Sequence, residues 1–308
     1  MRVIVPDEIY AATLRAAVPD VDCLVWHIDA PDSPPDAEML VTARPLDATH
    51  QPRITQIPSL RWLQLLSLGF DWIVDRLPAQ VTAMNARGCV EESTAEHALA
   101  LTIAGLRQYD AAFEQAAAHH WQTLWTRSLR TARVLLLGYG GLGKAIIRRL
   151  EAFDVAELTV VARTARTSAE TGRSVHAISE LDALLPAHDV LLLAIPLTHD
   201  TQGLIDARRL NLLPDDSLVV NVGRGGLIDT ADLLAELKQG RLRAALDVVD
   251  PEPLPVEHPL WEAPGVFITP HIGGNTDDFL HATRQLVAAQ VQAIIDRQTP
   301  ANIILTHE

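Results

Sequence analysis

The chain has 308 residues, which is enough for two domains of ordinary size. Hydrophobic residues make up 48% of it, but polar segments interrupt each apolar run before it could cross a membrane. We therefore expect a soluble, globular protein with no membrane partner. The formal net charge of −14 argues against nucleic acid as a main partner, because binding phosphates requires a basic face.

The two cysteines, Cys23 and Cys89, lie far apart without the spacing of a metal site, so we expect reduced thiols and no bound metal. The first residues, MRVIVPDE, are too short and too soon acidic for a signal peptide and are typical of a first β-strand. Both observations favour a cytoplasmic protein.

The first ninety residues alternate between apolar strands and helical segments. Asp7 can cap a helix that continues to about Val18. Strands are expected at residues 2–5, 21–28, 39–42, 60–67 and 81–83. This alternation predicts a small parallel α/β unit.

A long helix is expected next. Ser93-Thr94-Ala95-Glu96 fits a capping box, and the helical pattern after it continues to about Tyr109. A second helix is expected at 111–120. The long helix is a plausible crossing between domains, because a glycine-rich strand–helix segment follows it.

That segment, VLLLGYGGLGKAIIRRLEAF at 134–153, places G-x-G-x-x-G between a buried strand and a helix. Gly138 would allow the tight turn, Gly140 would let a pyrophosphate approach the backbone, and Gly143 would let the helix pack closely. The unpaired N–H groups at the helix start favour phosphate binding. The motif alone is also compatible with an ordinary turn, but in this context it indicates a dinucleotide-binding site.

The βαβ rhythm then continues to the end of the chain. Strands are expected at 158–162, 190–194, 218–222, 244–248 and 266–269, and helices at 181–185, 207–211 and 230–239. Asp229 can cap the last of these helices, and Thr276 or Asn275 can cap a final helix to about Arg297. This alternation predicts a parallel sheet with helices on both faces.

Chemistry-bearing residues follow several of these strands. Ligands of open parallel sheets bind beyond the carboxyl ends of the strands, where Pro196, Arg224, Asp247 and His271 are expected. A guanidinium at Arg224 could hold a carboxylate, and Glu252 beside His271 would raise the histidine pKa and make the imidazolium a proton donor. Each residue alone could be an ordinary solvated side chain, but together they indicate one catalytic site.

Four ordered motifs, GYGGLG, NVGRGGLID, DVVDPEPLP and TPHIGG, resemble the D-isomer-specific 2-hydroxyacid dehydrogenase family. LQLLSLGFD, TAEHALAL and IPLTHDTQGLI extend the resemblance over nearly the whole chain. The family implies two doubly wound α/β domains, with a Rossmann-type cofactor domain (94–279) inserted into a flavodoxin-like substrate domain (1–93 and 280–308). It also implies a homodimer formed through the cofactor domain.

The resemblance implies roles for individual residues. Arg224 would hold the carboxylate and carbonyl of a small 2-keto acid, Glu252 would orient and charge His271, and His271 would exchange the proton. The backbone of Leu68 and Gly69 would help bind the carboxylate. Glu252 also argues against the formate dehydrogenase branch, whose members have glutamine there. The cofactor-binding residues would be Gly138, Gly140, Gly141, Leu142, Gly143, Arg163, Thr164, Arg166, Pro196, Thr201, Val222, Gly223, Asp247, Gly273 and Gly274.

The strand at 158–162 departs from the commonest family pattern. It usually ends in an acidic residue that binds the ribose 2′-OH of NAD, but here the sequence is TVVARTAR. Arg163 and Arg166 could pair with a 2′-phosphate, so we expect NADP(H) to be preferred over NAD(H), although these arginines could also merely face solvent.

The substrate is less determined, because the family reduces glyoxylate, hydroxypyruvate, pyruvate and bulkier 2-keto acids and also includes phosphoglycerate dehydrogenases. The NADP(H) signal, the short chain and HWQ at 120–122 resemble the glyoxylate/hydroxypyruvate reductases. The alternative is a non-catalytic, NAD(P)-sensing protein like the family's corepressors. A hydrolase that retains NAD would need a larger substrate domain.

Overall fold

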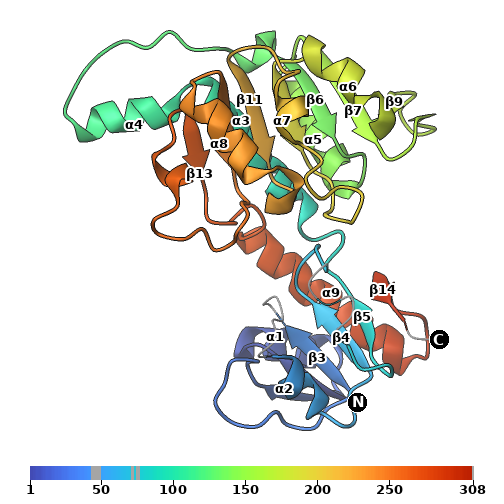
Figure 1. The fold of residues 1–308 in the computed structure, drawn as a ribbon. Coiled ribbons are helices and arrows are strands. Elements are labelled where there is room, and N and C mark those ends of the chain that lie inside the picture. The colour runs from blue at the N-terminus through green and yellow to red at the C-terminus, as the bar shows by residue number, and fades with distance from the viewer. Residues whose placement is uncertain (43–49, 71–72, 74–76, 307–308) are drawn as a thin grey trace. The chain divides into compact units, whose positions relative to one another are not determined.

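The computed structural model describes every residue except 43–49, 71–72, 74–76 and 307–308. It has two structural units: unit 1 is Met1–Val90 with Asn275–Glu308, and unit 2 is Glu91–Gly274 (Figure 1). The sequence predicted domain boundaries at 93/94 and 279/280. The observed boundaries, at 90/91 and 274/275, lie a few residues earlier. The first falls where helix α3 (Glu91–Leu106) begins, and the second falls just before helix α9 (Asp277–Ile295).

Unit 1 is built on a six-stranded sheet with the order β14-β5-β4-β3-β1-β2. Its strands are β1 (Arg2–Val5), β2 (Asp22–Val25), β3 (Met39–Thr42), β4 (Trp62–Leu65), β5 (Thr82–Met84) and β14 (Ile303–Leu305). All neighbours pair in parallel except β14, which is antiparallel to β5. Helices α1 (Glu8–Ala17) and α9 pack on one face, and residues around α2 (Gln51–Thr55) cover the other.

Unit 2 is built on an eight-stranded sheet with the order β13-β12-β11-β10-β6-β7-β9-β8. Its strands are β6 (Arg133–Leu137), β7 (Glu157–Ala162), β8 (Arg166–Thr167), β9 (Ser174–Ala177), β10 (Val190–Leu193), β11 (Ser217–Asn221), β12 (Leu242–Leu246) and β13 (Val266–Ile268). Its helices after α3 are α4 (Tyr109–Ala117), α5 (Gly141–Ala152), α6 (Leu181–Leu184), α7 (Ala207–Leu210) and α8 (Thr230–Lys238). Only the pairing of β8 with β9 is antiparallel among these described strands.

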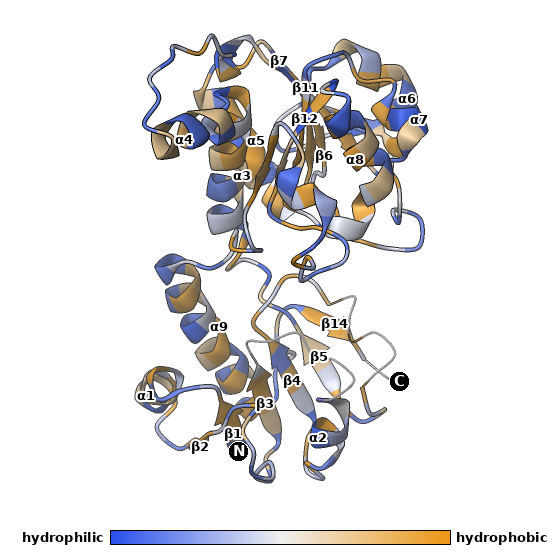
Figure 2. Ribbon diagram, turned by 60° about the vertical axis from the view of Figure 1, so that its left-hand side comes forward, coloured by the Kyte–Doolittle hydropathy of each residue, from blue (hydrophilic) through white to orange (hydrophobic). Residues whose placement is uncertain are grey.

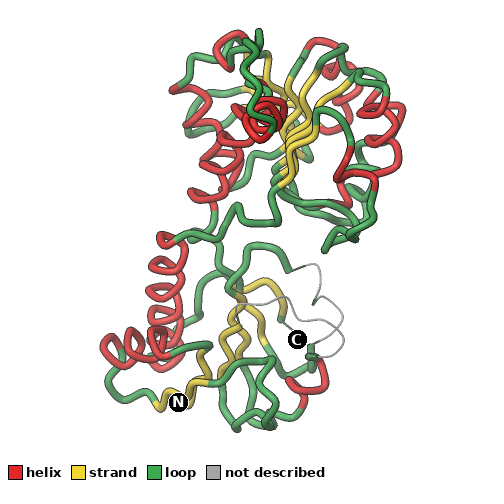
Figure 3. The backbone as a smooth tube through the Cα atoms, turned by 90° about the vertical axis from the view of Figure 1, so that its left-hand side faces the viewer, coloured by secondary structure: helices red, strands yellow, loops and turns green. Residues whose placement is uncertain are grey.

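The central strands of unit 2 are apolar on both faces, as a parallel sheet between helices requires. Within β6, Val134 and Leu136 face the core beneath α3 and α5, while Leu135 and Leu137 face the opposite core beneath α8. Figure 2 shows these hydrophobic strands between the helices, and Figure 3 shows strands flanked by helices in each unit. The predicted α/β fold class, with parallel sheets and a Rossmann-type unit, is confirmed.

The predicted caps at Asp7, Asp229 and Thr276 are confirmed, since each side chain accepts backbone N–H groups of the helix it precedes. The capping box expected at Ser93 is wrong. Helix α3 has already begun at Glu91, and Ser93 lies inside it and is buried. No helix in the described part of the chain is long and apolar enough to cross a membrane.

Candidate active site

The carboxyl ends of the parallel strands of unit 2 bring the predicted residues to one edge of the sheet. Because β6, β7 and β10 to β13 all run in the same direction, the residues that follow them share that edge. In sheet order, from one side to the other, these are His271 after β13, Asp247 after β12, Arg224 after β11, Pro196 after β10, Gly138 after β6 and Arg163 after β7.

The glycine-rich turn after β6 is shaped by two close backbone contacts. Gly138 has a φ of +133°, and a Cβ placed there would lie 2.5 Å from the carbonyl oxygen of Ala194. A Cβ on Gly143 would lie 2.1 Å from the carbonyl oxygen of Gly138, so the first turn of α5 packs against the turn itself. A Cβ on Gly140 would meet no atom within 4 Å. The open side at Gly140, next to the start of α5, fits a pyrophosphate group.

The histidine and the glutamate come together. The Nδ1–H group of His271 donates a 2.5 Å hydrogen bond to Oε1 of Glu252, which lies on the proline-rich loop after β12. His271 has a φ of +52°, a left-handed conformation that is uncommon outside glycine, and the N–H group of His271 donates to the carbonyl oxygen of Asp247. The bond to Glu252 raises the pKa of His271, against a smaller opposing effect of burial.

Arg224 lies beyond β11 on a loop fixed by Asn221. The Asn221 amide donates to the Arg224 carbonyl oxygen at 2.9 Å and accepts from the Gly223 N–H group at 3.0 Å. The guanidinium is half-buried and donates to the Gly223 carbonyl oxygen at 2.7 Å. Its positive charge acts on His271, where it opposes the effect of Glu252 on the histidine pKa. The three predicted catalytic side chains thus converge at one edge of unit 2.

Asp247 holds the loop that carries His271. It is 3% exposed and accepts hydrogen bonds from Thr269 Oγ1 at 2.6 Å, from His97 Nε2 at 3.1 Å, and from the N–H groups of Ile272 and Gly273 at 2.9 Å each. Burial alone would raise its pKa, but these hydrogen bonds outweigh burial and lower the pKa of Asp247 to about 2. The carboxylate is therefore ionised at neutral pH and fastens residues 269–273 to β12.

Sequence reasoning missed His97, which lies on α3 and whose Nε2 lies 3.1 Å from Asp247 Oδ1 and 2.9 Å from Thr269 Oγ1. Its partners are 150 and 172 residues away along the chain, so no local pattern marks it. The TAEHALAL segment, which extends the family resemblance, contains His97, but its helical pattern does not indicate the contacts of this histidine.

The remaining predicted cofactor residues occupy the same edge or the turns beside it. The Thr201 hydroxyl donates to the Pro196 carbonyl oxygen at 2.8 Å, and the Val222 N–H group donates to the Leu193 carbonyl oxygen at 3.1 Å. Leu142 is buried in the core, so only its backbone could serve a phosphate. Gly141 is the first residue of α5, and Gly223 and Gly274 lie on the loops after β11 and β13.

The predicted substrate-binding backbone lies in unit 1, beyond the carboxyl end of β4. The Leu68 carbonyl oxygen accepts from the Asn85 amide at 2.9 Å, and the Gly69 carbonyl oxygen accepts from the Ser67 hydroxyl at 2.8 Å. Asp71, the last residue of the LGFD segment, lies outside the described residues.

At the end of β7, Arg163, Thr164 and Arg166 are exposed. Arg166 Nη1 donates to the Thr164 carbonyl oxygen at 3.3 Å, and its guanidinium carbon lies 5.3 Å from the centre of the Tyr139 ring. Tyr139 belongs to the glycine-rich turn, so Arg166 adjoins the start of α5.

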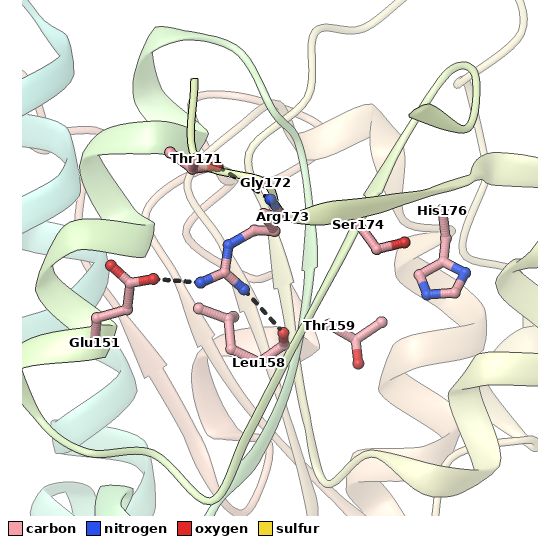
Figure 4. Close-up of a pocket in the computed structure, with 8 residues that line it drawn as sticks. All are labelled: Glu151, Leu158, Thr159, Thr171, Gly172, Arg173, Ser174 and His176. Carbon is pink, nitrogen blue, oxygen red and sulfur yellow. Dashed lines mark hydrogen bonds and ion pairs between the residues drawn. The ribbon is translucent and has the colours of Figure 1, made fainter. Parts of the chain in front are cut away.

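A polar hollow of about 360 Å³ lies nearby, lined by Glu151, Leu158, Thr159, Thr171, Gly172, Arg173, Ser174 and His176 (Figure 4). Figure 4 shows the Arg173 guanidinium between the Glu151 carboxylate and the Leu158 carbonyl oxygen. Its cation is already paired, and its lining contains none of Arg224, Glu252 and His271, so we do not assign the catalytic site there.

Comparison with known proteins agrees with this geometry. Residues 99–273 match the family model for the NAD binding domain of D-isomer specific 2-hydroxyacid dehydrogenases. Glyoxylate/hydroxypyruvate reductase B of Yersinia enterocolitica is 31% identical over 244 residues, which cover 77% of this chain and 73% of that protein.

Two solved structures are also similar over the whole chain. A D-isomer specific 2-hydroxyacid dehydrogenase family protein from Aeromonas salmonicida aligns with a TM-score of 0.85 at 27% identity and covers 99% of this chain and 98% of that one. A D-isomer specific 2-hydroxyacid dehydrogenase from Xanthobacter autotrophicus, in complex with NADPH and MES, has a TM-score of 0.82 at 25% identity, with 99% and 98% covered.

The chain therefore belongs to the D-isomer specific 2-hydroxyacid dehydrogenase family, as its motifs predicted. The family consists of NAD(P)-dependent oxidoreductases that act on small 2-hydroxy and 2-keto acids.

Proposed function

We propose that this protein uses NADPH to reduce a small 2-keto acid to the 2-hydroxy acid, of D configuration where the product is chiral. Glyoxylate and hydroxypyruvate are the first candidate substrates. The observation that carries the proposal is the His271–Glu252 contact at 2.5 Å, located beside Arg224 on the strand-end edge of a Rossmann-type unit. An imidazolium, its carboxylate partner and a guanidinium are the groups that this reaction needs.

Arg224 would bind the substrate, and His271 with Glu252 would transfer the proton. The two-pronged guanidinium of Arg224 would bind the substrate carboxylate and carbonyl oxygen. It would also stabilise the negative charge that develops on that oxygen during reduction. His271, kept protonated to higher pH by Glu252, would donate a proton to that oxygen as the carbonyl is reduced. In the reverse direction, neutral His271 would accept the hydroxyl proton.

The turn at Gly138–Gly143 and the first turn of α5 would hold the pyrophosphate of the cofactor, which supplies the hydride when it is bound. Support comes from the open space at Gly140 and the tight packing at Gly138 and Gly143. The cofactor would be NADP(H) rather than NAD(H). Strand β7 ends at Ala162 without a carboxylate, Arg163 and Arg166 follow it, and the similar protein from Xanthobacter autotrophicus binds NADPH.

The experiment is a panel of 2-keto acids assayed with NADPH and with NADH, including glyoxylate, hydroxypyruvate, pyruvate and a bulky branched acid. We expect turnover of glyoxylate and hydroxypyruvate, with kcat/KM at least about tenfold higher for NADPH than for NADH, because a phosphate–arginine pair contributes about 1.4 kcal/mol or more. Stronger activity with NADH would overturn the cofactor assignment. Binding of NADPH with no turnover across the panel would favour the non-catalytic sensor.

We further propose that the protein acts as a homodimer joined through unit 2. Helix α4 has no buried residue, and Figure 1 shows it at the outside of unit 2, followed by a long loop. We call residues 109–128, which comprise α4 and the loop after it, the arm. On this arm, Phe113, Trp121 and Trp125 are 60%, 98% and 94% exposed. Aromatic side chains exposed to this degree on one segment are typical of a surface that a partner covers.

A further inference from the structure

The glycine-rich turn and the β8–β9 hairpin carry a cluster of charges next to the proposed NADP(H) site. Two cations lie near the Tyr139 ring, with Lys144 Nζ at 5.6 Å and the Arg166 guanidinium carbon at 5.3 Å from its centre. Both distances fall within the range of cation–π attraction. The Tyr139 hydroxyl also hydrogen-bonds to Thr171 Oγ1, at 3.3 Å, on the loop of the hairpin.

The hairpin is fastened to α5 by two ion pairs of opposite polarity. Near the start of the helix, Lys144 donates to the Glu170 carboxylate. Two turns further along α5, the Glu151 carboxylate accepts from Arg173, which lies on the hairpin (Figure 4). Both pairs join a cation to a glutamate, but of the two only Lys144–Glu170 adjoins the Tyr139 ring.

This inference rests on the proposed use of NADP(H). We propose that Tyr139, Lys144 and Glu170 set the affinity for the 2′-phosphate: the tyrosine ring holds Arg166 and Lys144 in place, and Glu170 competes with the phosphate for Lys144. A phosphate monoester carries close to two negative charges at neutral pH. Lys144, Arg163 and Arg166 together outweigh the single carboxylate of Glu170, so the cluster retains the positive charge that such a ligand needs.

Glu170 lowers the affinity of the site for a 2′-phosphate. Its hydrogen bond with Lys144 holds the pKa of Glu170 below its ordinary value, so the carboxylate is charged at neutral pH. A 2′-phosphate that approaches Lys144 must displace this carboxylate or share the ammonium with it, and the two anions repel each other. Both groups are exposed, so the effect should decline as the ionic strength rises.

The experiment measures binding of two fragments to the full-length protein by calorimetry: 2′,5′-ADP, which carries the 2′-phosphate, and 5′-AMP, which differs from it only by a hydroxyl at that position. E170Q should bind 2′,5′-ADP about three- to tenfold more tightly than the wild type and bind 5′-AMP unchanged. E151Q, which breaks the matched ion pair on the same hairpin, should change neither affinity.

The tyrosine is tested with a pair of substitutions. Y139L should weaken binding of 2′,5′-ADP about two- to fivefold, the range expected for exposed cation–π contacts, whereas Y139F keeps the ring and should stay within about twofold of the wild type. The proposal is overturned if E170Q does not tighten 2′,5′-ADP binding selectively, or if Y139F and Y139L behave alike.

These outcomes separate this inference from the proposed function. If the wild type favours 2′,5′-ADP and the variants do not differ, the charge-tuning inference fails and the NADP(H) assignment stands. If the wild type favours 5′-AMP but E170Q binds 2′,5′-ADP selectively more tightly than the wild type does, the inference stands and the assignment fails. If the wild type favours 5′-AMP and E170Q does not tighten 2′,5′-ADP binding, both fail.

Discussion

The proton-transfer chemistry depends on the contact between His271 and Glu252. Because Glu252 raises the histidine pKa, the imidazolium persists above the ordinary value of 6.5, and reduction should slow as pH rises through the raised pKa. E252Q removes the charge, so we expect the alkaline limb of kcat/KM for reduction to move to lower pH. The measurement is a pH–rate profile with E257Q, a carboxylate change on the same loop, as the control. An alkaline limb that stays in place in E252Q would contradict this role.

Arg224 should contribute more through the shape of its guanidinium than through its charge alone. R224K keeps a cation but loses the planar fork that a carboxylate and carbonyl require. We expect kcat/KM to fall about 10- to 100-fold, because a bidentate charged pair contributes roughly 1.5–3 kcal/mol. Steady-state kinetics with glyoxylate, and cofactor binding as a control for folding, would measure this. An R224K variant with wild-type kinetics would remove Arg224 from the substrate site.

Among elements, the carboxyl end of β12 joins α3 to the catalytic loop through Asp247. The folded pKa of about 2 lies below the ordinary value of 3.8, so Asp247 contributes stability above pH 4 that is lost as pH falls toward 2. The difference corresponds to about 2 kcal/mol. Urea unfolding at pH 5, 4, 3 and 2 should show a steeper loss of stability in the wild type than in D247N. Equal pH dependence would mean that the carboxylate is not held as described.

His97 supplies one of the donors to this carboxylate. H97L leaves Asp247 and Thr269 without that donor at a largely buried position, so we expect a loss of about 1–3 kcal/mol in the free energy of unfolding. H97Q can still donate and should recover part of that loss. Denaturant midpoints of the two variants give the comparison, and equal midpoints for H97L and the wild type would contradict the link from α3 to the loop.

Two glycines of the glycine-rich motif are expected to serve different purposes: Gly143 is needed for folding and Gly140 for binding of the cofactor. G143A would place a Cβ 2.1 Å from the Gly138 carbonyl oxygen, so it should destabilise unit 2 by about 1–3 kcal/mol or more. G140A projects into open space and should unfold like the wild type. It should nevertheless bind NADPH at least about tenfold more weakly, because its methyl group would obstruct the pyrophosphate. Thermal unfolding and NADPH titration test this, and normal NADPH binding by G140A would place the phosphates elsewhere.

The sequence predicted the elements whose signals are local and strong. Runs such as Val134–Leu137 are apolar on both faces and end in glycine, so these strands and the residues after them could be recognised in order. Strand β8 has only two residues, both polar, β9 has a single fully buried residue, Val175, and the pairing of β14 with β5 depends on distant segments. Neither the hairpin nor that pairing was therefore predicted. The start of α3 was misplaced because Glu91 and Glu92 already provide the acidic first turn that favours a helix N-terminus.

The same distinction holds for the candidate site. The strand-end positions of Arg224 and His271 follow from the parallel sheet, which sequence periodicity predicts. The network around Asp247 joins three segments far apart in the chain, so its partners could not be assigned without coordinates. The pairing of Glu252 with His271 was expected because a carboxylate beside a histidine suits the chemistry, and the structure supplies the distance.

For the whole molecule, the proposed dimer accounts for the exposed arm at 109–128. Replacing Trp121 and Trp125 with serine removes most of the aromatic surface that a partner would cover. The wild type should have twice the 33.6 kDa chain mass by light scattering after size-exclusion chromatography, and the double variant should shift toward the monomer. A monomeric wild type, or a double variant that dimerises equally well, would contradict this assignment.

The central claim is that His271 donates the proton during reduction of a 2-keto acid. The most direct measurement compares glyoxylate-dependent oxidation of NADPH, followed by its absorbance, in the wild type and in H271Q. We expect glyoxylate-dependent turnover by the wild type and a fall of about 10²- to 10⁴-fold in kcat for H271Q, with NADPH binding retained. An H271Q variant that reduces glyoxylate at the wild-type rate would contradict the claim.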